Sequence, residues 1–221
     1  LSRVQRAYTV PTLNDLARKL ASDASHELQL AVMHAASTNH TYFFREIEVL
    51  QQFRTRILPD LAQRDEIRIW SAACSTGDEA YTLAIMIAED FGLNALKRTH
   101  ILGTDISAPV VEQAEAGLFS EQRLERVPAD LRRKYFEPAG LAQYRIRQEL
   151  RDCCTFRQMN LKTTPYPFRK AFQTVFCRNI LYYFEQADQL ATLNAITQGV
   201  VAQFQRAQEQ HREVLREVVA A

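Results

Sequence analysis

The most unusual polar stretch in the chain is the loop 73–77, Ala-Cys-Ser-Thr-Gly, which Asp78 and Glu79 follow directly. Gly77 permits a tight turn and a close backbone approach to a ligand, but the glycine-rich fingerprint of a dinucleotide site is absent. Two carboxylates here would repel a pyrophosphate, by roughly 1 kcal/mol per unit pair in water and about 4 kcal/mol near a protein surface at about 4 Å. The loop therefore favours a neutral or cationic ligand. Alternatively, the two acids simply complement the dipole of the helix that they begin.

A second candidate is Asp105, which follows the strand-like segment 100–104. An acid at the end of the second strand of an open α/β sheet can accept hydrogen bonds from both hydroxyls of a ribose. The same residues also fit a helix entry, with Ser107 as N-cap and Pro109 in the first turn. Together with the loop 73–77, Asp105 indicates a nucleoside site without a diphosphate. S-adenosylmethionine, which carries a sulfonium cation, meets that description.

An alternation of strand and helix patterns must position these residues. The segments with strand or helix character are, in order, 67–71, 78–91, 100–104, 108–116, 155–159, 174–177 and 186–204. Strands separated by helices of this length imply right-handed crossovers and a parallel sheet. The predicted fold class is therefore α/β, and its ligand-binding residues should lie just beyond the carboxyl ends of the strands.

Helical periodicity dominates the start of the chain. Apolar positions at helical spacing predict two short helices between residues 11 and 36. A third helix is expected over residues 42–58, ending just before Pro59. We therefore expect residues 1–58 to form a small N-terminal helical region whose third helix is a lid over the site.

Residues 59–221 are expected to form the main domain, with two departures from plain alternation. Partial alternation within 144–150 predicts a small antiparallel β-subdomain, inserted at about 138–160. Residues 203–219 carry too few apolar positions for a buried strand and predict a charged helix. In that case the sheet lacks its last strands, and the open edge would recruit a covering element or lead to self-association through this helix.

The composition argues against several classes of function. The formal net charge of +1 and the scattered Lys and Arg leave no basic stripe for the phosphates of a nucleic acid. The 4 cysteines lack paired metal-ligand spacing, so no metal site is predicted. The longest apolar run, 83–88, is far too short to cross a bilayer, and no signal-peptide pattern is present. We expect a cytoplasmic protein without membrane insertion or a nucleic-acid partner.

Four segments resemble the chemotaxis receptor methyltransferases of the CheR family. They are Thr-Asn-His-Thr-Tyr-Phe-Phe-Arg-Glu at 38–46, Ile-Trp-Ser-Ala-Ala-Cys-Ser-Thr-Gly-Asp-Glu at 69–79, Gly-Thr-Asp-Ile at 103–106 and Phe-Cys-Arg-Asn-Ile-Leu-Tyr-Tyr-Phe at 176–184. The resemblance covers roughly residues 39–184. It implies a Rossmann-like S-adenosylmethionine methyltransferase sheet. It also implies methylation of glutamate side chains on the cytoplasmic helices of chemotaxis receptors, which gives γ-glutamyl methyl esters and S-adenosylhomocysteine.

The resemblance assigns roles to individual residues. The cofactor-binding residues that it implies are Asn39, Thr41, Arg45, Glu79, Asp105, Asn160, Leu161, Arg178 and Asn179. The catalytic residues that it implies are Arg45, Arg178 and Tyr183. Because a glutamate carboxylate is already ionised at neutral pH, transfer needs no strong base. Orientation and desolvation in a closed site are expected to supply the rate.

Two departures from the family pattern keep an alternative open. The N-terminal helical region is short, and the C-terminal tail differs from the family's final strands. The tail favours an alternative in which the chain binds the cofactor but serves regulation or complex assembly. Methylation of a nucleic acid or a small molecule is disfavoured by the charge and by Cys-Arg-Asn at 177–179. Residues 138–144 lack the extra glycines expected of members that bind a receptor's C-terminal peptide, so we expect peptide-independent docking.

Overall fold

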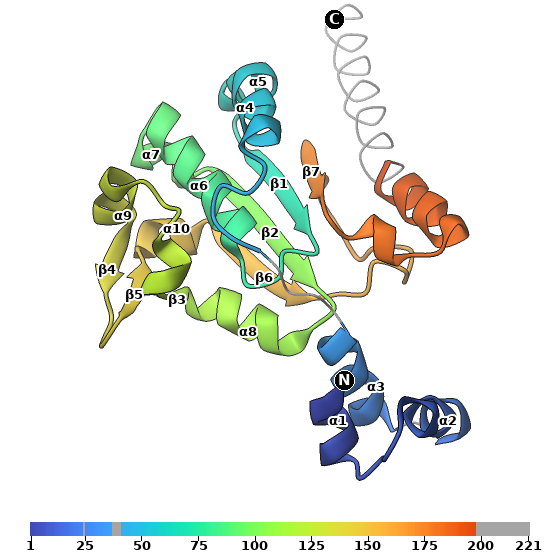
Figure 1. Cartoon of the computed structure of the whole chain (residues 1–221). Coiled ribbons are helices and arrows are strands. Elements are labelled where there is room, and N and C mark those ends of the chain that lie inside the picture. The colour runs from blue at the N-terminus through green and yellow to red at the C-terminus, as the bar shows by residue number, and fades with distance from the viewer. Residues whose placement is uncertain (24, 37–40, 198–221) are drawn as a thin grey trace, which may run out of the picture.

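The computed structural model describes residues 1–23, 25–36 and 41–197 (Figure 1). The chain begins with the short helices α1 (Ser2–Ala7), α2 (Leu13–Asp23) and α3 (His26–Ala36). The two helices expected between residues 11 and 36 are thus confirmed, whereas α1 was not predicted. These helices share a small apolar core of their own, built on Val4, Val10, Leu16 and Leu28. They lie apart from the sheet at the bottom of Figure 1.

The prediction of a single helix over residues 42–58 is wrong. The structure has two helices instead, α4 (Ile47–Arg56) and α5 (Leu58–Ala62). Pro59 lies in the first turn of α5, where a missing N–H costs no hydrogen bond, so it helps to begin a helix rather than to end one. Residues 41–46 form an irregular segment, and Arg45 therefore lies in a turn ahead of α4, not on a lid helix.

The predicted parallel α/β sheet is confirmed. Its strands are β1 (Ile67–Ala72), β2 (Thr99–Asp105), β6 (Cys154–Gln158) and β7 (Thr174–Cys177), and their order is β6-β2-β1-β7. The helices of the first crossovers are α6 (Asp78–Phe91), α7 (Leu93–Leu96) and α8 (Ala108–Ala116). The chain adds β2 and β6 on one side of β1 and then returns to place β7 on the other. The strand order thus reverses between β1 and β7, and ligands of open α/β sheets bind at such a switch point.

Both faces of the sheet are covered by apolar side chains. Successive side chains of a strand point to opposite faces, so Ile69 of β1 joins the core against α6, while Trp70 faces the other side. Trp70 is buried, and its indole N–H donates to Thr104 Oγ1 at 2.9 Å. Phe168 and Phe172 from the segment after β6 pack around it. Packing on both faces therefore fixes the positions of the residues at the carboxyl ends of the strands.

An additional antiparallel sheet is present, as predicted, but it begins earlier in the chain. Its strands are β3 (Leu118–Ser120), β4 (Phe136–Pro138) and β5 (Gln143–Ile146), in the order β3-β5-β4. The short helices η1 (Glu121–Leu124) and α9 (Ala129–Tyr135) connect β3 to β4 within it, and α10 (Gln148–Asp152) leads from β5 to β6 of the main sheet. The sheet thus spans 118–146 rather than 138–160, because β3 and β4 are too short to produce an alternating pattern. Phe43 packs edge-on against Phe119 and Phe136 and joins this sheet to the segment ahead of α4.

After β7 the chain forms the short helix η2 (Leu181–Tyr183), and residues 186–197 are helical. The rest of the helix expected over 186–204 and the helix predicted at 203–219 lie outside the described residues. In the part of the chain that is described, β7 is an edge of the parallel sheet. No helix within that part is long and apolar enough to cross a membrane.

Candidate active site

A cavity of about 540 Å³ opens at the carboxyl ends of the parallel strands. Its walls come from the loop after β1, the residues after β2, β6 and β7, and the irregular segment ahead of α4. The site residues expected from the sequence that line it are Thr41, Arg45, Glu79, Asp105, Asn160, Leu161, Arg178, Asn179 and Tyr183. Asn39 lies outside the described residues. The fold therefore brings together residues from five separate segments.

The loop after β1 has positive φ angles, which residues other than glycine rarely adopt. Ala73 and Ser75 have φ values of 67° and 50°, in the left-handed region that is uncommon for residues other than glycine. Gly77 has φ 85°, and a Cβ there would lie 3.0 Å from the Ala114 Cβ of α8. The loop is nevertheless anchored, because Cys74 N–H donates to the Thr104 carbonyl at 2.8 Å. Gly77 is thus required by both conformation and close packing.

Asp105 organises this loop from the end of β2. Its Oδ2 accepts the N–H of Ser75 at 2.9 Å and its Oδ1 accepts the N–H of Ser107 at 3.0 Å. A carboxylate has about four acceptor sites and can accept hydroxyl groups as well as backbone N–H groups. The predicted helix entry is also present, since Ser107 is the N-cap residue of α8, although its side chain makes no capping bond.

The two acids after Gly77 have different surroundings. Asp78 is fully buried and does not line the cavity. Its carboxylate accepts Arg123 Nη2 at 2.6 Å and Thr76 Oγ1 at 2.8 Å. Arg123 belongs to η1, between β3 and β4 of the antiparallel sheet, and also donates to Thr76 Oγ1 at 2.7 Å. We call residues 118–146, which contain this sheet, the insertion. The buried ion pair therefore fastens the cavity loop to the insertion, a contact that no spacing in the sequence signals.

Glu79 instead faces the cavity. Ser71 Oγ donates to its Oε1 at 2.6 Å, and Arg178 Nη1 donates to its Oε2 at 3.1 Å. Burial raises the pKa of Glu79, and the bonds from Ser71 and Arg178 oppose that rise. A half-buried carboxylate paired with Arg178 is a suitable neighbour for a cationic ligand group, because a further positive charge would stabilise its ionised form.

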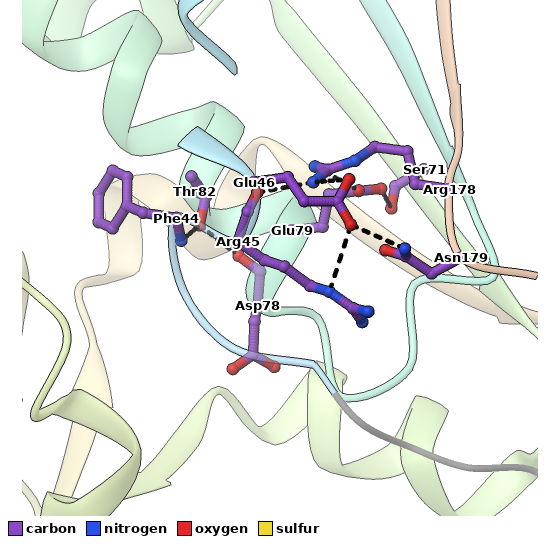
Figure 2. A network of polar contacts seen from close by, with 9 residues as sticks. All are labelled: Phe44, Arg45, Glu46, Ser71, Asp78, Glu79, Thr82, Arg178 and Asn179. Atoms are coloured by element: carbon purple, nitrogen blue, oxygen red, sulfur yellow. Dashed lines mark hydrogen bonds and ion pairs between the residues drawn. The ribbon is translucent and has the colours of Figure 1, made fainter. Parts of the chain in front are cut away.

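Arg178 is the centre of a polar network that Figure 2 shows. Its Nη2 donates to the Arg45 carbonyl at 2.6 Å and to Glu46 Oε2 at 3.1 Å, while Nη1 reaches Glu79. Asn179 Nδ2 donates to the other oxygen of Glu46 at 2.8 Å. Glu46 was not identified from the sequence, and only its position beside Arg45 could have drawn attention to it.

Two buried polar atoms at this cavity have no hydrogen-bond partner among the described residues. They are Ser75 Oγ and Arg178 Nε, and both residues line the cavity. An unsatisfied buried polar group costs about 1–3 kcal/mol, so such groups point to a ligand that completes them. With the acids Glu79 and Asp105, the cavity suits a ligand that has a cationic end, hydroxyl groups and hydrogen-bond acceptors, as S-adenosylmethionine does.

The mouth of the cavity is aromatic. The rings of Tyr182 and Tyr183 contact each other at a tilt of 43° with their centroids 4.3 Å apart, and their hydroxyl groups lie 3.3 Å from each other. Both side chains are largely exposed and both line the cavity. Tyr42 lines the cavity too, and the guanidinium of Arg126 lies 4.2 Å from its ring centroid. Neither Tyr42 nor Tyr182 was singled out from the sequence, because an aromatic residue in an apolar segment is usually part of a core.

Comparison with known proteins agrees with this geometry. The family model described as CheR methyltransferase, SAM binding domain, matches residues 39–203. A chemotaxis protein methyltransferase of Borreliella burgdorferi is 38% identical over 157 residues, covering 68% of this chain but 56% of that protein. One of Vibrio parahaemolyticus is 32% identical over 206 residues, covering 90% of this chain and 74% of that protein. One of Escherichia coli K12 is 34% identical over 196 residues, covering 80% and 66%. The chain belongs to the CheR methyltransferase family.

Proposed function

We propose that this chain transfers the methyl group of S-adenosylmethionine to glutamate side chains on the cytoplasmic helices of chemotaxis receptors. The observation that carries the proposal is one cavity at the switch point of the sheet, lined by two acids and two arginines. Membership of the CheR family supports the same assignment. We infer that the reaction takes place in the cytoplasm, because the proposed acceptor helices are the cytoplasmic helices of the receptors.

The acids and the segment after β6 would hold the cofactor. Asp105, whose two oxygens are already oriented by backbone N–H groups, would accept the ribose hydroxyls. Glu79 would face the cationic methionine end, with its carboxylate held by Ser71. Asn160 and Leu161, which line the cavity beyond β6, would flank the adenine. When bound, S-adenosylmethionine supplies a methyl group on a sulfonium, which an oxygen nucleophile can accept.

The arginines and the tyrosine at the mouth would serve the acceptor glutamate. The carboxylate of a glutamate is ionised at neutral pH, so these residues need to orient it rather than to deprotonate it. Arg45 and Arg178 are cations that can hold a carboxylate by charge-assisted hydrogen bonds. Tyr183, at the exposed rim, would lie beside the reacting carboxylate and help to exclude water.

Calorimetry followed by a transfer assay tests this function. The chain should bind S-adenosylmethionine and S-adenosylhomocysteine, and it should incorporate labelled methyl groups into a receptor cytoplasmic fragment as base-labile esters. A fragment with glutamine in place of the acceptor glutamates should take up no label. Binding without transfer to any receptor fragment would instead favour a regulatory or assembly role, and absence of binding would refute both.

A variant of the ribose residue sharpens the test. Asp105→Ala should weaken cofactor binding by about 1.5–3 kcal/mol, the usual contribution of hydrogen bonds to a charged group. Asp65→Ala is the matched control, because Asp65 is exposed in the loop before β1 and does not line the cavity. Equal affinities of the two variants would remove Asp105 from the ribose site.

A further inference from the structure

Backbone strain is concentrated around the cavity. Of the 7 described non-glycine residues with positive φ, five surround it: Phe44 (58°), Glu46 (54°), Ala73 (67°), Ser75 (50°) and Asn179 (57°). Each such residue costs of order 1–3 kcal/mol, and strained residues persist only where surrounding contacts hold them. The contacts that stabilise the turn at residues 44–46 therefore indicate its role at the site.

Three sets of contacts hold the turn at residues 44–46. Phe44 N–H donates to Thr82 Oγ1 of α6 at 3.2 Å, and Arg178 donates to the Arg45 carbonyl. The third set is made by the carboxylate of Glu46, which accepts Arg178 Nη2 on one oxygen and Asn179 Nδ2 on the other. Figure 2 shows this carboxylate between the side chains of Arg178, Asn179 and Arg45, whose Nε lies 3.7 Å away.

Glu46 is not among the residues that line the cavity, but all three of its partners are. It therefore acts on the site through other side chains. Asn179 and Arg178 lower the pKa of Glu46 by hydrogen bonding, so its carboxylate is ionised at neutral pH. Charge-assisted bonds of this kind are about twice as strong as neutral ones and fix orientation as well.

We propose that Glu46 is a positioning residue for methyl transfer, which rests on the function proposed above. Its carboxylate orients Arg178 and Asn179 at the end of β7 and fastens the turn that carries Arg45 to that strand end. The guanidinium of Arg178 lies between two carboxylates, those of Glu46 and Glu79. Without the charge of Glu46, Glu79 would be the one anionic partner of Arg178 left among the described residues, and Arg178 would shift toward it.

Substitution by glutamine tests this role. Glu46→Gln preserves the shape and one acceptor oxygen but removes the charge and the second acceptor. With saturating cofactor and receptor fragment, kcat should fall about ten-fold, because bonds to a charged group are lost in the arrangement that transfers the methyl group. Glu46→Asp keeps the charge on a shorter side chain and should recover part of kcat, which a purely steric role would not predict.

Glu48→Gln is the matched control. Glu46 is the N-cap residue of α4, and Glu48 is exposed in the first turn of that helix. Substitution of Glu48 therefore removes an equal charge near the same helix dipole. It should leave kcat within two-fold of the wild type. A Glu46→Gln enzyme with wild-type kcat, or with loss of thermal stability alone, would overturn the proposal. So would a lower KM for the receptor fragment with an undiminished kcat, since Glu46 would then be a competitor of the acceptor carboxylate.

These measurements distinguish failure of the proposed function from failure of the positioning role of Glu46. A wild type that methylates no receptor fragment refutes that function, whereas an active wild type matched by Glu46→Gln refutes only the positioning role. If the wild type binds S-adenosylhomocysteine without transfer, calorimetry decides the role of Glu46. Glu46→Gln should then bind S-adenosylhomocysteine at least about three-fold more weakly than Glu48→Gln, and equal affinities would refute positioning.

Discussion

Arg123→Gln should destabilise the protein strongly, although Arg123 lies outside the parallel sheet. Its guanidinium pairs with Asp78, whose side chain is 0% exposed, while the Arg123 side chain is 32% exposed. Removing one partner of a buried ion pair costs about 3–5 kcal/mol, because the other charge stays buried without compensation. Thr76 Oγ1 still donates to Asp78, and solvent reaches the Arg123 side, so we expect about 2–3 kcal/mol.

Urea unfolding measures this loss. Trp70 is the single tryptophan of the chain and is buried on one face of β1, so its fluorescence reports on unfolding of the parallel sheet. At an m-value of about 2.5 kcal/mol per molar urea, the expected loss lowers the midpoint by about 1 M without a change in m. The cofactor should also bind more weakly, because Arg123 holds Thr76 in the cavity loop.

The control for this prediction is another arginine of the insertion. Arg132 pairs with Glu121 at 2.7 Å, but the glutamate side chain is 55% exposed. Exposed ion pairs contribute about 0–1 kcal/mol, so Arg132→Gln should lower the midpoint by at most about 0.4 M. If Arg123→Gln shifts the midpoint no more than Arg132→Gln does, the buried pair does not fasten the loop to the insertion and the reasoning fails.

Two further predictions concern single charged residues. Arg45→Ala should lower methyl transfer even at saturating cofactor, because Arg45 lines the cavity and its turn is fastened to β7; a change confined to cofactor affinity would make it a binding residue only. Lys134 and Tyr135 lower the pKa of Glu89 by hydrogen bonding below its ordinary value of 4.5. At pH 7, Glu89→Gln should therefore be less stable than the wild type by about 0.5–1 kcal/mol in urea unfolding. This difference should be lost as the pH falls from 4.5 through the lowered pKa of Glu89, and a pH-independent difference would contradict the assignment.

Local patterns in the sequence were sufficient for the sheet and for the two acids of the cavity, whereas the family resemblance supplied the other expected residues. Alternating strand and helix periods predict β1, β2, β6 and β7 because buried parallel strands and amphipathic helices have different repeats. The polar tips of these strands then converge by topology, whatever the details of packing. Thus Glu79 and Asp105, which are distant in the sequence, could be placed in one site from the pattern, and the resemblance added Arg178 before any contact was known.

The tertiary structure decided what those residues contact. Asp78 and Glu79 are adjacent acids with the same local pattern, yet one is buried against Arg123 and the other faces the cavity. Arg45 lies in a strained turn rather than on a helix, because contacts from α6 and β7 stabilise left-handed residues that local propensity disfavours. The pairing of Glu46 with Arg178 and Asn179 could not be predicted from the sequence either, because contacts between distant side chains depend on distances that sequence spacing does not encode.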